Sequence, residues 1–111
     1  MATLSSHLLN SVNGTHADNV EIIIYQIKPN KEKNVFYETK TDSGGRLLKE
    51  FKLNDEDCKS EYEMICKTGD YFSKDKIVSE ITIKFKMPDP NKKYHIPIMI
   101  SPNSYSIWWS D

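Results

Sequence analysis

The chain has 111 residues, of which 38% are hydrophobic and 28% are charged, with a net charge of -1. This length fits one domain, residues 1–111, and the charge excludes a general attraction to nucleic acid or to an anionic membrane. No apolar run approaches the roughly 20 residues that a membrane-spanning helix needs. The N-terminus also lacks a charged leader and an apolar signal core, so we expect a cytoplasmic protein.

Alternating or β-branched segments, separated by turn signals such as Asn13-Gly14 and Pro88-Asp89-Pro90-Asn91, predict about eight short strands. In chain order these strands are 4–10, 20–27, 35–41, 46–51, 61–67, 79–86, 94–100 and 104–109. The acidic stretch 54–57 is predicted as a loop or a single helical turn, and 68–74 as one short helix. Strands at spacings of about 8–12 residues predict an all-β fold, a sandwich of two sheets.

Three side chains suited to hydrolysis lie far apart in the sequence: His7, Arg46 and His95. Histidine, with an ordinary pKa of about 6.5, can serve as a general base, and the arginine fork can hold a carbonyl oxygen or an oxyanion. Taken alone, His7 could equally be structural, and Arg46 after Gly44-Gly45 would be a surface turn residue. We expect no metal and no cofactor, because two histidines without a carboxylate or thiolate in the same motif make a poor zinc site.

Three blocks of the sequence carry a family resemblance. The first begins Leu4-Ser5-Ser6-His7-Leu8-Leu9-Asn10 and runs to Val20, the second is Thr39 to Arg46, and the third combines Tyr94-His95-Ile96-Pro97, Ser101-Pro102 and Tyr105-Ser106. These blocks resemble the transthyretin family, and in particular its 5-hydroxyisourate hydrolase branch. Hormone carriers of that family have a lysine where His7 stands and no histidine at the His95 position, so the resemblance favours the hydrolase branch.

The resemblance implies a transthyretin-like sandwich that forms a homotetramer, with the site in a channel where subunits meet. It implies hydrolysis of 5-hydroxyisourate in urate degradation, with His7 and His95 activating water and Arg46 holding the substrate oxygen. Trp108 would stack on the substrate ring, and Ser106 or Ser110 would donate a further hydrogen bond. The small-molecule substrate is the only partner expected besides further copies of the chain.

Two departures from the family pattern stand out. His16 occupies the place of the family's turn proline, and we interpret it as structural or solvated. The hydrolase C-terminal Tyr-Arg-Gly-Ser aligns with Trp108-Trp109-Ser110-Asp111. This altered tail keeps two alternatives open. One is a catalytically weak or silent protein that binds an aromatic small molecule in the channel, and the other is a purely structural oligomerisation module, which no sequence feature favours.

Overall fold

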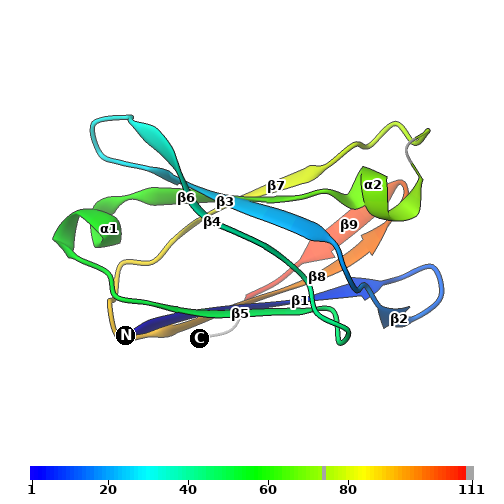
Figure 1. Ribbon diagram of the computed structural model, residues 1–111, viewed down its shortest axis with the longest axis horizontal. Helices are drawn as coiled ribbons and strands as arrows, with labels where there is room; N and C mark the ends of the chain where they lie inside the picture. Colours follow the sequence, from blue (N-terminus) through cyan, green and yellow to red (C-terminus); the bar gives the residue numbers. More distant parts are fainter. Residues whose placement is uncertain (74, 110–111) are drawn as a thin grey trace.

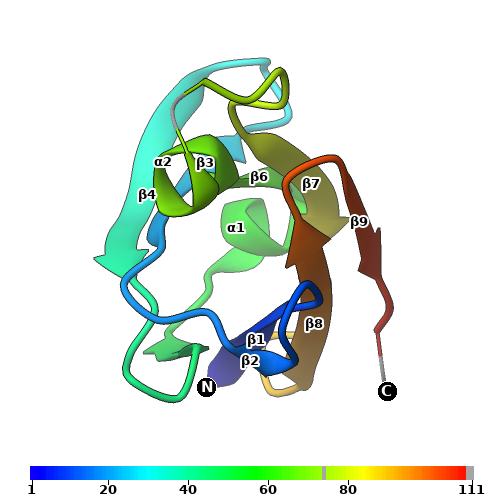
Figure 2. The ribbon, with the colours of Figure 1, turned by 90° about the vertical axis from the view of Figure 1, so that its right-hand side faces the viewer.

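The computed structural model describes residues 1–73 and 75–109. Two sheets face each other, with one short helix at each end of the molecule (Figures 1 and 2). The elements are β1 (Ala2–Asn10), β2 (Thr15–His16), β3 (Glu21–Ile27), β4 (Lys33–Lys40), β5 (Arg46–Phe51), α1 (Asp55–Lys59), β6 (Glu61–Cys66), α2 (Thr68–Phe72), β7 (Ile81–Lys86), β8 (Lys93–Ser101) and β9 (Ser104–Ile107). The predicted all-β sandwich is confirmed.

The two sheets have different strand orders. One sheet runs β4-β3-β6-β7, and its neighbouring strands are antiparallel. The other runs β2-β1-β8-β9, with β5 paired to β1. In this second sheet β1 and β8 are parallel, which requires a long crossover. The intervening chain supplies that crossover by building the first sheet.

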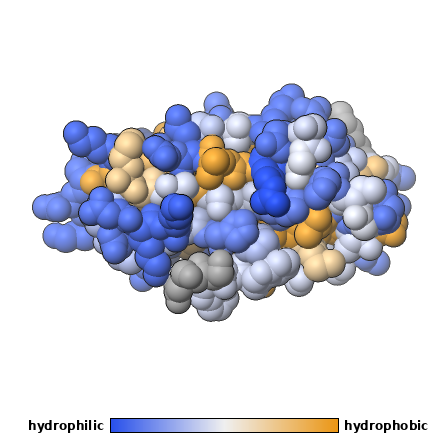
Figure 3. Space-filling view, turned by 90° about the horizontal axis from the view of Figure 1, so that it is seen from below, coloured by the Kyte–Doolittle hydropathy of each residue, from blue (hydrophilic) through white to orange (hydrophobic). Residues whose placement is uncertain are grey.

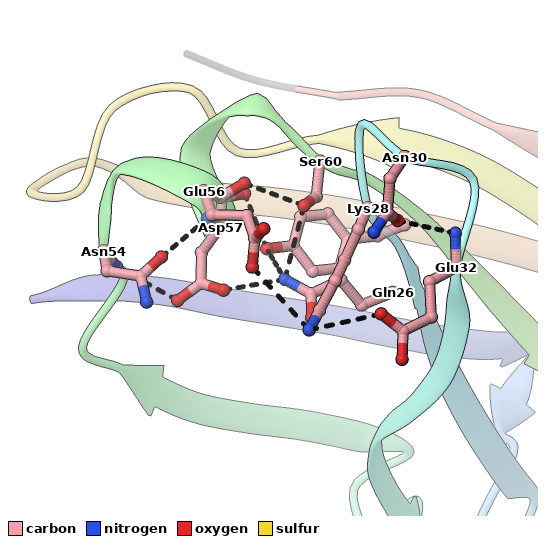
Figure 4. Close-up of polar contacts among 9 residues, drawn as sticks. Gln26, Lys28, Asn30, Glu32, Asn54, Glu56, Asp57 and Ser60 are labelled. Atoms are coloured by element: carbon pink, nitrogen blue, oxygen red, sulfur yellow. Dashed lines mark hydrogen bonds and ion pairs between the residues drawn. The ribbon is translucent and has the colours of Figure 1, made fainter.

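Within the described residues the structure adds two elements to the prediction. One is β2, a two-residue strand beside the end of β1, and the other is α1, which settles the 54–57 stretch as helical. Asn54 starts α1 through a capping box, because its side chain accepts from the Asp57 N–H (2.8 Å) while the Asp57 carboxylate accepts from the Asn54 N–H (3.0 Å). Figure 4 shows this cap beside the side chain of Gln26.

The core lies between the sheets and follows the two-residue period of the strands. In β1 the even-numbered residues are buried and the odd-numbered ones are half-buried on the outer face. The large, fully buried side chains of the core include Leu4, Leu8, Ile22, Ile24, Tyr62, Met64, Met87, Ile98 and Ile100. In β7, Ile81 and Ile83 belong to this core, and Phe85 packs against it half-buried. The same alternation sends Ser5 and His7 outward.

Both cysteines are free thiols. Burial raises the pKa of Cys66 to about 12 and also raises the pKa of Cys58, so both remain protonated at neutral pH. Among residues 1–73 and 75–109, no group of three or more His, Cys, Asp or Glu side chains is placed to hold a metal ion. The described helices are all too short to cross a membrane.

Candidate active site on the outer face of the β1–β8 sheet

Strand register brings the three predicted side chains to one face. His7 pairs directly with Arg46 across the antiparallel β1–β5 ladder. His95 pairs with Ser5 across the parallel β1–β8 ladder, two residues from His7 along β1. Neighbouring strands are about 4.8 Å apart and alternate residues about 7 Å apart, so the three side chains gather on the outer face of this sheet. Figure 3 views the molecule from that side, where the surface is mainly hydrophilic with separate apolar patches.

A tight turn positions Arg46 opposite His7. The Asp42 carboxylate accepts from the N–H groups of Gly44 and Arg46, each at 2.9 Å. Gly45 has a φ of +72°, and its carbonyl accepts from the N–H of Leu8 at 2.8 Å. A Cβ at this position would lie 2.5 Å from the Leu8 oxygen, so only glycine fits. The turn therefore fixes the start of β5 against β1.

Ser5 orients His95. Its hydroxyl lies 2.6 Å from Nδ1 of the half-buried His95 ring. Nε2 of His95 bonds to no other residue in the described ranges, so it is the ring nitrogen left for a ligand or water. A hydrogen bond on one ring nitrogen selects the tautomer and hence the chemistry of the other.

His7 has a different environment. Its Nε2 lies 2.9 Å from Nδ1 of His16, and the two rings are stacked with centroids 5.0 Å apart. The pKa of His7 is lowered, first by burial, then by the positive charge of Arg46 and by His16, while hydrogen bonding to the Gly44 backbone opposes the shift. His95 makes the smallest contribution of those resolved. Burial and Arg46 therefore outweigh the second predicted histidine as causes of the lowered pKa.

His16 is the site residue that sequence reasoning missed. Its side chain is exposed, as expected for a solvated residue, but it pairs with His7 rather than with water alone. The signal was present in the Asn13-Gly14 turn, because the β1–β2 hairpin it forms pairs His16 with Leu9. Leu9 shares the outer face with His7, so the hairpin register alone brings the two imidazoles together.

The predicted binding residues lie across β8 from His7. Ser106 in β9 is exposed and pairs with Met99. Trp108 follows β9, is 44% exposed, and donates its backbone N–H to the oxygen of Pro97 at 3.3 Å. Pro97 is also the register partner of His7, so Trp108 lies in line with His7 across the sheet. Ser110 lies outside the described residues.

One cavity of about 280 Å³ borders part of this region. It lies between β7 and β8, and its lining includes His95, Tyr94 and Trp109 but neither His7 nor Arg46. The predicted site is therefore an open face of the single chain and not an enclosed pocket. Leu48 and Met99, the register partners of Ser5 and Leu9, are large apolar side chains exposed on that face.

Comparison with known proteins shows the family to which this sandwich belongs. The profile described as "HIUase/Transthyretin family" matches residues 4–109. The chain belongs to this family. The 5-hydroxyisourate hydrolase of Salmonella typhimurium is 32% identical over 95% of this chain and 78% of its own length. That of Halalkalibacterium halodurans is 26% identical over 95% of this chain and 94% of its own.

A solved family structure supports the fold independently. The 5-hydroxyisourate hydrolase of Klebsiella pneumoniae superposes with a TM-score of 0.75 at 22% identity, covering 100% of both chains. The transthyretin-like sandwich is thereby confirmed, and the hydrolase relatives at 26% and 32% identity confirm the resemblance to that branch of the family. His16 stands where the family pattern has a turn proline, and in this chain its ring contacts His7.

Proposed function

We propose that this protein is a 5-hydroxyisourate hydrolase, which opens its substrate to 2-oxo-4-hydroxy-4-carboxy-5-ureidoimidazoline in urate degradation without a metal. The observation that carries the proposal is the convergence of His7, Arg46 and His95 on one face through two strand ladders. The names of the relatives, which match nearly the whole chain, support the same reaction. The proposal treats residues 1–111 as one domain in the cytoplasm.

In the proposed reaction His95 takes the proton from water. With Ser5 accepting the hydrogen on Nδ1, Nε2 presents its lone pair outward. The water oxygen then bonds to the ring carbonyl carbon, and the carbon–nitrogen bond of the ring breaks. The proton on His95 passes to the departing nitrogen, so the imidazole ends neutral and the substrate has gained one water.

Arg46 stabilises the charge that develops on the carbonyl oxygen. Its guanidinium is always protonated and presents a planar set of donors, which suits a flat heterocycle. An oxyanion donor of this kind contributes most when it is held in place before the reaction, and the Gly45 turn supplies that rigidity. The same positive charge helps to keep His7 neutral, and in the proposal this neutral ring polarises the attacking water together with His95.

Substrate binding would use the residues across β8. The Trp108 ring would stack on the heterocycle, and Ser106 would donate a hydrogen bond, a role that Ser110 could share. An open face holds a flat ligand weakly, so the proposal includes a homotetramer in which a second subunit covers the site. The exposed Leu48 and Met99 beside the polar groups support such a contact.

A second candidate is a silent protein that binds an aromatic small molecule. The exposure of two adjacent indoles, 44% for Trp108 and 74% for Trp109, favours it, since both could stack on a ligand without any chemistry. Under this alternative the histidines would be bystanders.

The experiment that separates the two follows the absorbance of 5-hydroxyisourate made in place from urate by uricase. The hydrolase proposal expects the intact chain to remove the intermediate much faster than its spontaneous decay. Indole fluorescence in the same solution reports binding. Quenching without faster decay would reject the hydrolase and support the silent binder.

A further inference from the structure

His16 is held in a defined position beside His7. The hairpin before it is fixed by Asn10, whose carbonyl accepts from the Gly14 N–H (2.8 Å), and by Asn13, whose side chain accepts from the Thr15 N–H (3.0 Å). On the other side, the turn at Gly45 lies against His16, because a Cβ built on Gly45 would be only 3.3 Å from the Cβ of His16. The contact between the two rings is therefore built into the hairpin and the adjacent turn.

The contact limits which ring nitrogens of the two histidines can carry a hydrogen and which keep a lone pair. At 2.9 Å, Nε2 of His7 and Nδ1 of His16 share one hydrogen. While they do so, the Nε2 lone pair of His7 is not available to water. The basic nitrogen of the neutral pair is then either Nδ1 of His7 or Nε2 of His16.

Exposure decides between these two. The side chain of His7 is half-buried on the outer face of β1, whereas the side chain of His16 is exposed. Nε2 of His16 is therefore the nitrogen that solvent reaches, which places the bridging hydrogen on Nδ1 of His16 in the neutral pair.

We propose that His7 and His16 bind a proton as one unit, and that the outer nitrogen of His16 is where this proton enters and leaves. A proton taken up at Nε2 of His16 makes that ring an imidazolium, whose Nδ1 hydrogen can move to Nε2 of His7. No other bond changes, and the pair gains one positive charge. The inference deepens the proposed hydrolase, on which its kinetic part rests, by naming the group that sets the charge of the site at low pH.

The surroundings limit the pair to a single extra proton. Arg46 on β5 and His95 on β8 both oppose a charge on His7, whereas Asp42 in the turn before β5 is close enough for His7 to lower the pKa of its carboxyl. If both rings were charged, two N–H groups would point at each other across 2.9 Å. A proton on one ring therefore disfavours a second proton on the other.

The first test is independent of any substrate. Nitrogen-15 spectra of the histidine rings, recorded against pH, report the protonation of each nitrogen in the full chain. Both rings should shift over the same pH range, and His16→Ala should raise the apparent pKa of His7 because a positive neighbour and a donor to Nε2 are removed. Separate titrations, with His7 unchanged in His16→Ala, would overturn the proposal.

The kinetic test compares two substitutions of His16. Asparagine places an amide near Nδ1 and can still donate to His7, but it offers no second nitrogen for a proton. Because His95 returns the water proton to the departing nitrogen, we expect both His16 variants to keep the plateau value of kcat within about twofold. His16→Ala frees Nε2 of His7 and should move the acid limb of the pH–rate profile to higher pH, and His16→Asn, which still donates to Nε2, should move it less.

Thr3→Ala, on the same face of β1 but distant from the hairpin, is the matched control and should leave kcat and the profile unchanged. A wild-type pH–rate profile in both His16 variants would overturn the inference. If the wild-type chain does not remove 5-hydroxyisourate at all, the hydrolase proposal fails, and the ring spectra still decide whether the histidines act as a pair.

Discussion

Two polar clusters in this molecule use their hydrogen bonds in opposite ways. At the α1 end, the buried Gln26 donates to the Asp57 carboxylate at 2.7 Å (Figure 4). It also donates to the Tyr62 hydroxyl at 3.3 Å, and that hydroxyl donates to the Asp57 carbonyl. On the outer face of the other sheet, His95 uses one nitrogen for Ser5 and has its other nitrogen free of described partners.

The difference separates a structural cluster from a candidate reactive one. Burial raises the pKa of Tyr62 to about 12, so its hydroxyl stays neutral and serves only as a hydrogen-bonding group. The pKa of His7 is lowered, so this half-buried ring is neutral near neutral pH. Satisfied, buried polar groups should matter for stability, and partly satisfied groups on the open face should matter for turnover. Each substitution below tests that division.

The largest effect is expected for His95→Asn. Removal of the proposed base should lower kcat by about 10² to 10⁴-fold, with little change in thermal stability, because the ring is only half-buried. The uricase-coupled assay and a melting curve measure the two quantities. Glu50→Gln, an exposed change elsewhere on β5, is the control, and activity within twofold of wild type in His95→Asn would remove this residue from the mechanism.

Arg46→Ala should come next. Loss of an oxyanion donor typically costs about 10²-fold in kcat, and Arg46 is exposed, so the fold should persist. Arg46→Lys keeps the charge but not the planar fork, and it should recover only part of the rate. Steady-state kinetics distinguish this from simple binding: a change confined to KM would contradict an oxyanion role.

Gly45→Ala tests the turn that joins the site to the fold. The added Cβ would meet the Leu8 oxygen at 2.5 Å in a backbone with φ of +72°, so we expect a loss of about 3 kcal/mol in the free energy of unfolding. Gly14→Ala is the matched control, since its φ is +75° but its surroundings are open, and it should cost about 1 kcal/mol. Denaturant titration giving equal costs would show that the close contact is unimportant.

The smallest effect on turnover should come from the α1 cluster. Gln26→Met keeps the length of the side chain but leaves its partners without the amide donor, which should cost about 1–2 kcal/mol of stability. Glu32→Gln removes only an exposed ion pair with Lys28 and should change stability by less than about 0.5 kcal/mol. A reduced kcat in well-folded Gln26→Met would break the division between the clusters.

The sequence predicted the elements better than their arrangement. Alternation and turn signals located the strands, because a strand has a fixed two-residue period and turn residues end it. The parallel pairing of β1 with β8 left no local signature, since it joins residues about 90 positions apart, such as Ser5 and His95. Only the family resemblance connected His7 with His95 before the register was known.

The candidate site shows the same limit. The Gly44-Gly45 pair announced a turn, but the approach of Gly45 to Leu8, which fixes Arg46 beside His7, depends on a neighbouring strand. His16 was interpreted residue by residue as a solvated turn position, and its contact with His7 arises from hairpin register. Local sequence patterns predict a single strand, whereas a site on a sheet depends on which residues of neighbouring strands pair with each other.

The most direct test of the account is a double-mutant cycle on His95→Asn and Arg46→Ala, measured as kcat/KM for 5-hydroxyisourate. Residues that act together on one reacting carbonyl are strongly non-additive. We therefore predict that Arg46→Ala costs far less in the His95→Asn background than it does in the wild type. Losses that simply multiply would show that these two side chains do not act as one site.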